Sequence, residues 1–338
     1  MTARIAGTVA QADRVTPTGA TQAGTAKEEG TMEAKISRGS WCLAFGFDPV
    51  PSLEQVVKVL SVFGYDGIEL AGFFDHATVE RYPDKQSRKK LVDWIGSHDL
   101  EIAGYAPGPY GDFGKYAWAT GGDDVVAAYE AFFEAHLRFC VDCGIPAMRV
   151  DPGDFGPLAR DADYDKAWER VVTVFRRHAE RGAEVGVSML WELESGQIFV
   201  KPSEAVKLLN DVGHDNLELM YDIGHVEAAC VLAHNHVQPA ERLAGGQLEF
   251  VEMMKGKIGH MHVCDTDSNT WHNAFGTHLG IGKGVIDFDV LIPAVVDAGY
   301  TSKWWSVDAI PMTAESWADT WSDRFALDAL LDKHVRSR

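Results

Sequence analysis

Short apolar runs alternate with longer amphipathic stretches along the chain from Trp41 onward. The short runs are typical of buried strands, whereas apolar residues recurring every three to four positions are typical of helices. Strands are predicted at residues 41–47, 67–70, 101–106, 147–151, 187–194, 217–222, 258–264 and 304–308. Helices are predicted to begin after Ser52 and to cover residues 89–98, 123–143, 163–185, 202–212, 241–255, 288–298 and 314–334.

Strand–helix units repeating in one direction, with no internal break rich in Pro, Gly or Ser, predict an α/β fold of the (β/α)₈ barrel type. A doubly wound open sheet is the alternative, but it would place a glycine-rich fingerprint after the first strand, and residues 45–49 do not supply one. The glycine-rich run Leu279–Gly284 does not directly follow a predicted strand, so we interpret it as a mobile active-site loop rather than a phosphate cradle.

Residues 1–37 are rich in Ala, Thr, Gly and Gln and contain almost no large apolar residue. Such a segment cannot bury enough surface to fold, so we predict a disordered extension followed by a single barrel domain at residues 38–338. The segment has no apolar core of a secretory signal, and Met32 is an alternative translation start.

Composition narrows the class of protein. The net charge of −19 argues against a nucleic-acid partner, and no apolar run approaches the ~20 residues that cross a membrane. The five cysteines are an odd number, scattered through predicted core elements, which predicts a reduced cytoplasmic protein. Cys140 and Cys143 fall inside a predicted helix and are interpreted as two ordinary helix positions.

Polar residues gather where predicted strands end. His260 and His262 lie two apart in one strand, so both imidazoles point the same way. Because barrel chemistry lies at the carboxyl ends of the strands, these side chains are expected to converge on a divalent cation. The strand-end residues are Glu69, Arg149, Asp151, Glu192, Glu194, Asp222, His225, His260, His262 and Asp308. Alternatively, Glu69 makes only loop hydrogen bonds, and His260 is a core residue or merely supports a ligand.

Over roughly residues 41–308, the chain resembles the xylose-isomerase-like barrels of the sugar phosphate isomerase/epimerase superfamily. The resemblance rests on motifs in this order: a Glu, Asp222-Ile-Gly-His225, His260-Met-His262 and a final carboxylate. The resemblance implies a divalent metal, with Mn²⁺ first and Mg²⁺, Co²⁺ or Zn²⁺ as alternatives. It implies that the ligands are Glu192, Asp222, His262 and Asp308. The family usually has Glu at the last position, so Asp308 shortens that arm. Glu194 faces the same way as Glu192 and stays an alternative ligand.

Three stretches resemble a narrower branch: Trp191–Glu204, the step Thr277-His278, and Trp304–Asp308. They are similar to the catalytic alpha subunits of bacterial C-glycoside deglycosidases, which pair a metal-bearing barrel with a small β-rich partner. The resemblance implies a lyase that cleaves the carbon–carbon bond of 3-oxo-C-glycosides within a hetero-oligomer. The alternative is a keto-sugar or inositol isomerase or epimerase, which would form the same enolate.

The expected roles follow from this chemistry. The catalytic base is predicted among Glu194, His225, His260 and His278, although His225 alternatively only orients a ligand. Substrate contacts are expected from Arg149, Asp151, Trp191 and Lys201. An apolar wall for a flat substrate is expected from Trp41, Tyr105, Tyr110, Phe113, Trp191, Trp271, Trp304 and Trp305. A nuclease of the endonuclease IV type is disfavoured by the acidic charge; a non-enzymatic scaffold with a vestigial metal site is the remaining alternative.

Overall fold

The computed structural model describes residues 32–45, 47–108, 117–153, 163–271, 275–310 and 316–338. The chain divides into two units, Met1–Gly30 and Thr31–Arg338, and every described residue belongs to the second unit. The predicted disorder of the extension falls almost entirely outside the described residues and stays a prediction.

Parallel strands close into a barrel in the order β1-β10-β7-β6-β5-β4-β3-β2. This confirms the (β/α)₈ prediction and excludes the open sheet. The register places Asp222 of β6 and Ser306 of β10 on either side of His262 in β7. The strands are β1 (Lys35–Gly39), β2 (Gly67–Ala71), β3 (Glu101–Ala106), β4 (Ala147–Val150), β5 (Ser188–Glu192), β6 (Leu217–Asp222), β7 (Ile258–Val263) and β10 (Trp304–Val307).

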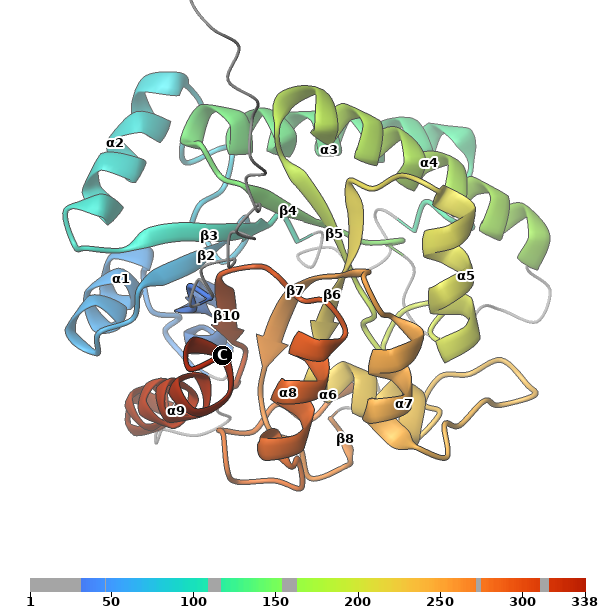
Figure 1. Ribbon diagram of the computed structural model, residues 1–338. Helices are drawn as coiled ribbons and strands as arrows, with labels where there is room; N and C mark the ends of the chain where they lie inside the picture. Colours follow the sequence, from blue (N-terminus) through green and yellow to red (C-terminus); the bar gives the residue numbers. More distant parts are fainter. Residues whose placement is uncertain (1–31, 46, 109–116, 154–162, 272–274, 311–315) are drawn as a thin grey trace, which may run out of the picture. The chain divides into compact units, whose positions relative to one another are not determined.

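The long helices lie outside the ring of strands (Figure 1). They are α1 (Leu53–Val62), α2 (Lys85–Gly96), α3 (Asp123–Cys143), α4 (Tyr164–Val185), α5 (Pro202–Val212), α7 (Gly246–Met253), α8 (Phe288–Asp297) and α9 (Ser316–Leu331). Local sequence explains their ends: Ser52 forms a capping box with Gln55 at the start of α1, and Gly144 ends α3 in the left-handed conformation. Shorter elements are the 3₁₀ turn η1 (Ser40–Leu43), α6 (Ile223–Val226), the π turns η2 (Glu227–Val231) and η3 (Asp332–Arg336), and the hairpin of β8 (Thr270–Trp271) and β9 (Phe275–Gly276).

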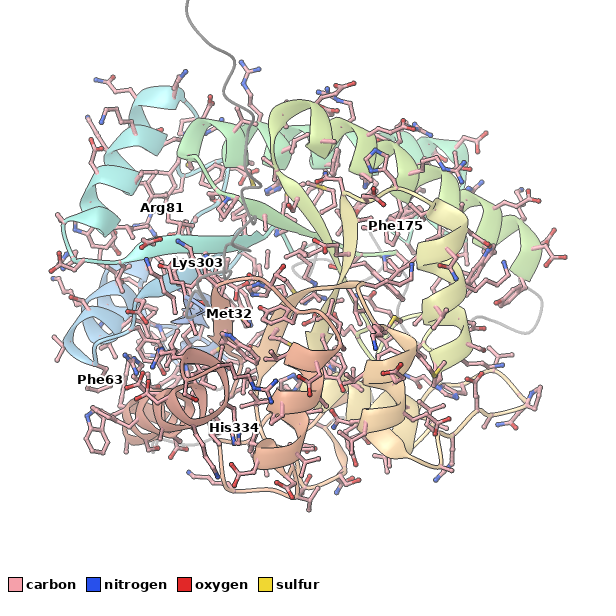
Figure 2. All side chains as sticks on the ribbon, viewed as in Figure 1. Met32, Phe63, Arg81, Phe175, Lys303 and His334 are labelled. Atoms are coloured by element: carbon pink, nitrogen blue, oxygen red, sulfur yellow. The ribbon has the colours of Figure 1, made fainter. Side chains whose placement is uncertain are left out.

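The apolar core fills the layer between strands and helices. Trp191 and Tyr221 are buried there, and the Tyr221 hydroxyl donates to Gln247 Oε1 of α7 at 3.0 Å. Phe175 of α4, labelled in Figure 2, is fully buried. Because side chains alternate along a strand, the residues that follow Trp191 and Tyr221, namely Glu192 and Asp222, point to the inner side of the barrel. The outer layer therefore fixes the strands that carry the polar residues.

The first strand differs from the prediction. It is Lys35–Gly39, whereas the apolar residues Trp41 to Leu43 form the 3₁₀ turn η1, so the predicted strand at residues 41–47 is wrong. The cause is Arg38, a charged residue in the middle of β1 that is fully buried and pairs with Asp323 of α9 at 3.1 Å. Apolar patterning cannot reveal a strand whose buried position is charged. The barrel consequently begins before residue 38.

The glycine-rich run after β7 is tied to the barrel. Asp265 accepts hydrogen bonds from the backbone N–H groups of Gly282 at 3.0 Å and Gly284 at 2.8 Å. Asp323 accepts one from Ile281 at 2.9 Å. These bonds hold the loop against the end of β7 and against α9, and its mobility stays a prediction.

The cysteine prediction agrees with the structure in one respect: all five thiols are free and buried. Cys140 and Cys143 lie in α3, as predicted. Within the described residues, no helix combines the length and the apolar character needed to span a membrane.

Candidate metal centre

Four side chains from neighbouring strands meet at the carboxyl end of the barrel. Glu192, Asp222, His262 and Asp308 each offer one ligand atom, and these atoms lie within 4.8 Å of one another. His262 Nδ1 lies 2.7 Å from Glu192 Oε1, 3.4 Å from Asp308 Oδ2 and 3.8 Å from Asp222 Oδ2. All four side chains are buried. The structure therefore brings together the four residues that the sequence resemblance implied.

The donor set suits a divalent cation. Three carboxylates and one imidazole nitrogen are ligands that Mn²⁺, Mg²⁺ and Zn²⁺ all accept. Asp222 Oδ2 is buried and accepts no hydrogen bond from the described residues, although a buried carboxylate oxygen normally has a donor. A cation between Asp222, His262 and Asp308 would satisfy this oxygen. The residues thus fit a metal, and their chemistry does not single out one metal.

The ionisable groups of the cluster shift one another's pKa values. Burial alone would raise the pKa of Asp222, but His278 and His225 outweigh it and hold that pKa below its usual range. Burial also opposes ionisation of Glu192, yet Arg149 and His262 lower its pKa to about 2. Burial would lower the pKa of His262, but Glu69 and Asp308 raise it well above its usual value. Without a metal, His262 therefore carries the proton that a cation would replace.

Two donors orient Asp308, the residue that departs from the family pattern. Its Oδ1 accepts hydrogen bonds from Trp41 Nε1 at 2.8 Å and from the Cys42 thiol at 2.8 Å. Both donors lie in η1, directly after β1. Oδ2 is consequently the oxygen that faces His262.

A salt-bridge network extends the centre toward β4. Arg149 Nε lies 2.9 Å from Asp151 Oδ2, and the same guanidinium pairs with Glu192 and Glu194. Gln197 Nε2 donates to Glu194 Oε2 at 3.0 Å. Burial raises the pKa of Glu194 to about 7, with Asp151 and Glu192 adding to the effect against Arg149. Geometry thus favours Glu192 as the ligand and places Glu194 beside Arg149.

The centre opens into a cavity of about 420 Å³ whose lining is part polar and part apolar. The polar lining consists of Arg149, Glu192, Glu194, His225, His278 and Asp308. The apolar lining consists of Trp41, Phe45, Phe73, Phe74, Ala106, Trp271, Phe275 and Ile310, which we call the aromatic wall. Phe74 contacts Phe45 edge-on with ring centroids 4.9 Å apart, and Phe73 at 5.0 Å. The cavity can therefore hold hydroxyl groups at its polar residues and cover an apolar group with the aromatic wall.

Two histidines stand beside the carboxylates in this cavity. His225 and His278 contact each other edge-on with ring centroids 4.6 Å apart, and His278 Nε2 lies 3.1 Å from Asp222 Oδ1. Burial lowers the pKa of His225 to about 4. Burial also works to lower the pKa of His278, but Asp222 outweighs it and raises that pKa to about 10. At neutral pH the pair therefore presents one neutral and one protonated imidazole.

Some predicted residues lie elsewhere. His260 is not among the described residues that line the cavity; its Nε2 lies 3.0 Å from Glu69 Oε1 inside the barrel, which speaks against it as the base. Lys201 lies at the start of α5 and lines a separate surface pocket, away from the centre. Trp191 is buried under the helices. Asp151 reaches the centre through Arg149.

The predicted aromatic wall is partly correct. Trp41 and Trp271 line the cavity, whereas Tyr105, Trp304 and Trp305 are buried elsewhere. Tyr110 and Phe113 lie outside the described residues. The prediction missed six residues: Phe45, Phe73, Phe74, Ala106, Phe275 and Ile310. A signal for Phe73 and Phe74 existed, because they follow the end of β2 almost directly.

Comparison with known proteins identifies the family. A family model described as "Xylose isomerase-like TIM barrel" matches residues 57–327. No curated protein matches the chain.

Solved structures agree in fold. A D-tagatose 3-epimerase-like protein superimposes with a TM-score of 0.65 at 18% identity, covering 88% of this chain and 97% of that one. An L-ribulose 3-epimerase gives 0.66 at 18% identity, covering 90% and 96%. The IOLI protein, with a binding zinc atom, gives 0.61 at 16% identity, covering 89% and 99%. The match of the family model over most of the barrel, together with this fold, shows that the chain belongs to the xylose isomerase-like TIM barrel family.

Proposed function

We propose that the protein is a divalent-metal-dependent lyase that cleaves the carbon–carbon bond between a 3-oxo sugar and an aromatic aglycone. The observation that supports this proposal most directly is the mixed lining of the cavity, in which a carboxylate–histidine centre adjoins the aromatic wall. A free sugar offers hydroxyl groups on most of its surface and gains little from eight apolar neighbours. A sugar joined to a flat apolar group matches both parts of the lining.

The proposed metal ligands are Glu192, Asp222, His262 and Asp308. A divalent cation bound there would act as a Lewis acid that polarises the ketone of the substrate. Arg149 and Glu194, which form an ion pair in the polar lining, would bind sugar hydroxyl groups and hold the substrate against the centre. The aromatic wall would exclude water from the reacting bond.

The proposed reaction begins at C2 of the sugar, next to the ketone. Glu194 or His225 takes the C2 proton, and the electron pair of that bond forms the enolate. The pair then forms a C1–C2 double bond as the bond from C1 to the aglycone breaks. The aglycone carbon leaves with the electron pair and takes a proton, for which His278 lies at the same cavity. Atoms and charge balance without an oxidant.

The small β-rich partner subunit implied by the sequence resemblance is part of this proposal. Its expected contribution is to cover the open side of the cavity, because a partner placed there would complete the enclosure of an aglycone. The comparison of activity with and without such a subunit tests this part separately.

Epimerisation of a free keto-sugar is the second candidate function. It is favoured by the structural neighbours, which include a D-tagatose 3-epimerase-like protein and an L-ribulose 3-epimerase. The same proton removal would be followed by proton return to the opposite face of the sugar. This reaction makes no use of the aromatic wall, which is why we rank it second.

Product analysis distinguishes the two candidates. The Mn²⁺-loaded protein is incubated in D₂O with an aryl 3-oxo-C-glucoside and, separately, with D-tagatose, and the products are identified by mass spectrometry and chromatography. Release of free aglycone that is lost in Asp222→Ala supports the lyase. Asp215→Ala is the matched control, because Asp215 is exposed near the opposite end of β6. Deuterium-labelled epimer from D-tagatose, with the C-glucoside intact, would contradict the lyase and favour the epimerase.

A further inference from the structure

A buried carboxylate lies in the barrel interior directly behind the metal centre. Glu69 of β2 accepts from two histidines of β7: its Oε1 lies 3.0 Å from His260 Nε2, and its Oε2 lies 3.4 Å from His262 Nε2. Glu69, His260 and His262 are each at most 3% exposed. This group has no place in the reaction proposed above, because neither Glu69 nor His260 is among the described residues that line the cavity.

The interior of a (β/α)₈ barrel is normally filled by branched apolar side chains. A buried carboxylate in their place is costly unless it is fully paired. The chain also leaves room for it: a Cβ atom at Gly104 of β3 would lie 3.2 Å from Glu69 Oε2. The packing therefore accommodates the Glu69 carboxylate. The cost of burying it must be offset by the residues that it contacts.

That contact is a candidate metal ligand. The His262 ring uses its two nitrogens on opposite sides: Nε2 faces Glu69, whereas Nδ1 faces Glu192, Asp222 and Asp308. An acceptor at Nε2 keeps the ring proton there, and the lone pair of Nδ1 is then available to a cation. Metal-bound histidines commonly need such an acceptor, because it selects the tautomer and fixes the ring plane.

We propose that Glu69 is the positioning residue of the metal centre. It holds His262 in the orientation and tautomer that present Nδ1 to a divalent cation, and His260 holds Glu69 by occupying its other oxygen. This inference rests on the proposed metal site and adds to it a residue that contacts neither metal nor substrate.

The substitution Glu69→Gln tests the proposal. Two imidazole N–H donors need two acceptor oxygens, and an amide offers one, so one histidine must change its tautomer or lose its bond. We expect Mn²⁺ to bind the metal-free variant about 10 to 100 times more weakly than it binds the metal-free wild type. The matched control is Glu218→Gln, which makes the same chemical change near the other end of the barrel, beside Gly259, and is expected to leave Mn²⁺ affinity unchanged.

A second measurement needs no variant. Nitrogen-15 spectra of the histidine side chains in the Zn²⁺-loaded wild type should show His262 protonated at Nε2 and coordinated through Nδ1. Coordination through Nε2, or unchanged Mn²⁺ affinity in a folded Glu69→Gln, would overturn the proposal while leaving the metal site in place. If the variant does not fold, the wild-type spectrum decides. A wild type that binds no divalent metal would overturn both this inference and the proposed function.

Discussion

Two buried charge networks lie near the carboxyl ends of the barrel strands, and they differ in the kind of atom that lacks a hydrogen-bond partner among the described residues. In the first, Arg38 pairs with Asp323 at 3.1 Å and donates to the Ala309 carbonyl at 2.6 Å and the Tyr65 hydroxyl at 3.3 Å. Asp323 also accepts the Ile281 N–H at 2.9 Å, so both of its oxygens have donors. Arg38 Nε has no hydrogen-bond partner among the described residues, but it is a donor, and a cation could not satisfy it. The ion pair joins β1 to α9.

The second network is the metal centre, and it contains a buried acceptor without a donor in the described part of the chain. Glu192, Asp222 and Asp308 surround the His262 imidazole, with Arg149 beside Glu192 and His278 beside Asp222. Asp222 Oδ2 nevertheless accepts no hydrogen bond from the described residues. Burial raises the pKa of Asp308, and Asp222 and Glu192 add to this effect against His262 and His278. The comparison teaches that burial of charge alone does not indicate a binding site. The informative feature is a buried acceptor oxygen among side chains that can all bind a metal, because a cation would supply its missing partner.

Metal removal should separate the two networks most strongly. Mn²⁺ at about 1,000 times its Kd is expected to stabilise the wild type by about 4 kcal/mol relative to the metal-free protein. In Asp222→Asn this gain should fall below about 1 kcal/mol, because one ligand is lost. Chemical denaturation with EDTA or with Mn²⁺ measures both values. Equal stabilisation of wild type and variant would show that the cation binds elsewhere.

The network of Arg38 and Asp323 should respond in the opposite manner. Asp323→Asn leaves Arg38 buried without its charged partner, and we expect a loss of about 3 to 5 kcal/mol in the free energy of unfolding. The loss should be the same with EDTA and with Mn²⁺. The control is Glu101→Gln, which removes the exposed ion pairs of Glu101 with Lys35 and with Lys303, the latter labelled in Figure 2. A loss of about 0 to 1 kcal/mol is expected for each exposed pair. A loss that depends on Mn²⁺ would show that the networks are coupled.

The contrast also explains what sequence reasoning found. Strand periodicity located β2 to β7 and β10, and residues at their ends supplied the four members of the metal centre, because parallel strands deliver their last residues to one place. The motif of His260 and His262 was found for the same reason. Alternation placed both on the inner side, although only His262 reaches the centre.

The remaining features depend on partners that are distant in sequence. Arg38 is separated by 285 residues from Asp323, so its burial in a strand could not be inferred from its neighbours. Misplacing β1 also obscured the donors Trp41 and Cys42, which lie in the turn after it. Glu69 was noted at a strand end, but its contact with His262 depends on barrel closure.

His136 extends the comparison to a buried titratable group that has no oppositely charged partner among the described residues. His136 of α3 lies 2.7 Å from the Tyr105 hydroxyl, and burial, with a contribution from Arg88, lowers its pKa to about 3. Below pH 6.5, His136 is protonated in the unfolded chain but stays neutral in the folded chain. The free energy of unfolding therefore decreases as the pH falls from 6.5 toward 3. We expect about 2 kcal/mol of loss between pH 7 and pH 5. Chemical denaturation at both pH values should show that His136→Gln loses less free energy of unfolding between pH 7 and pH 5 than the wild type. An equal loss in variant and wild type would assign the pH dependence to other groups.

The smallest expected effect concerns the two donors that orient Asp308. Cys42→Ala removes one hydrogen bond to Oδ1 and leaves the bond from Trp41, so Asp308 is held less firmly toward His262. One hydrogen bond contributes about 1 kcal/mol, which corresponds to Mn²⁺ binding about five times more weakly. Cys42→Ser keeps a donor and should retain most of the affinity. Equal weakening in both variants would show that Cys42 matters for its packing, and unchanged affinity in Cys42→Ala would show that Trp41 alone positions this shortened ligand.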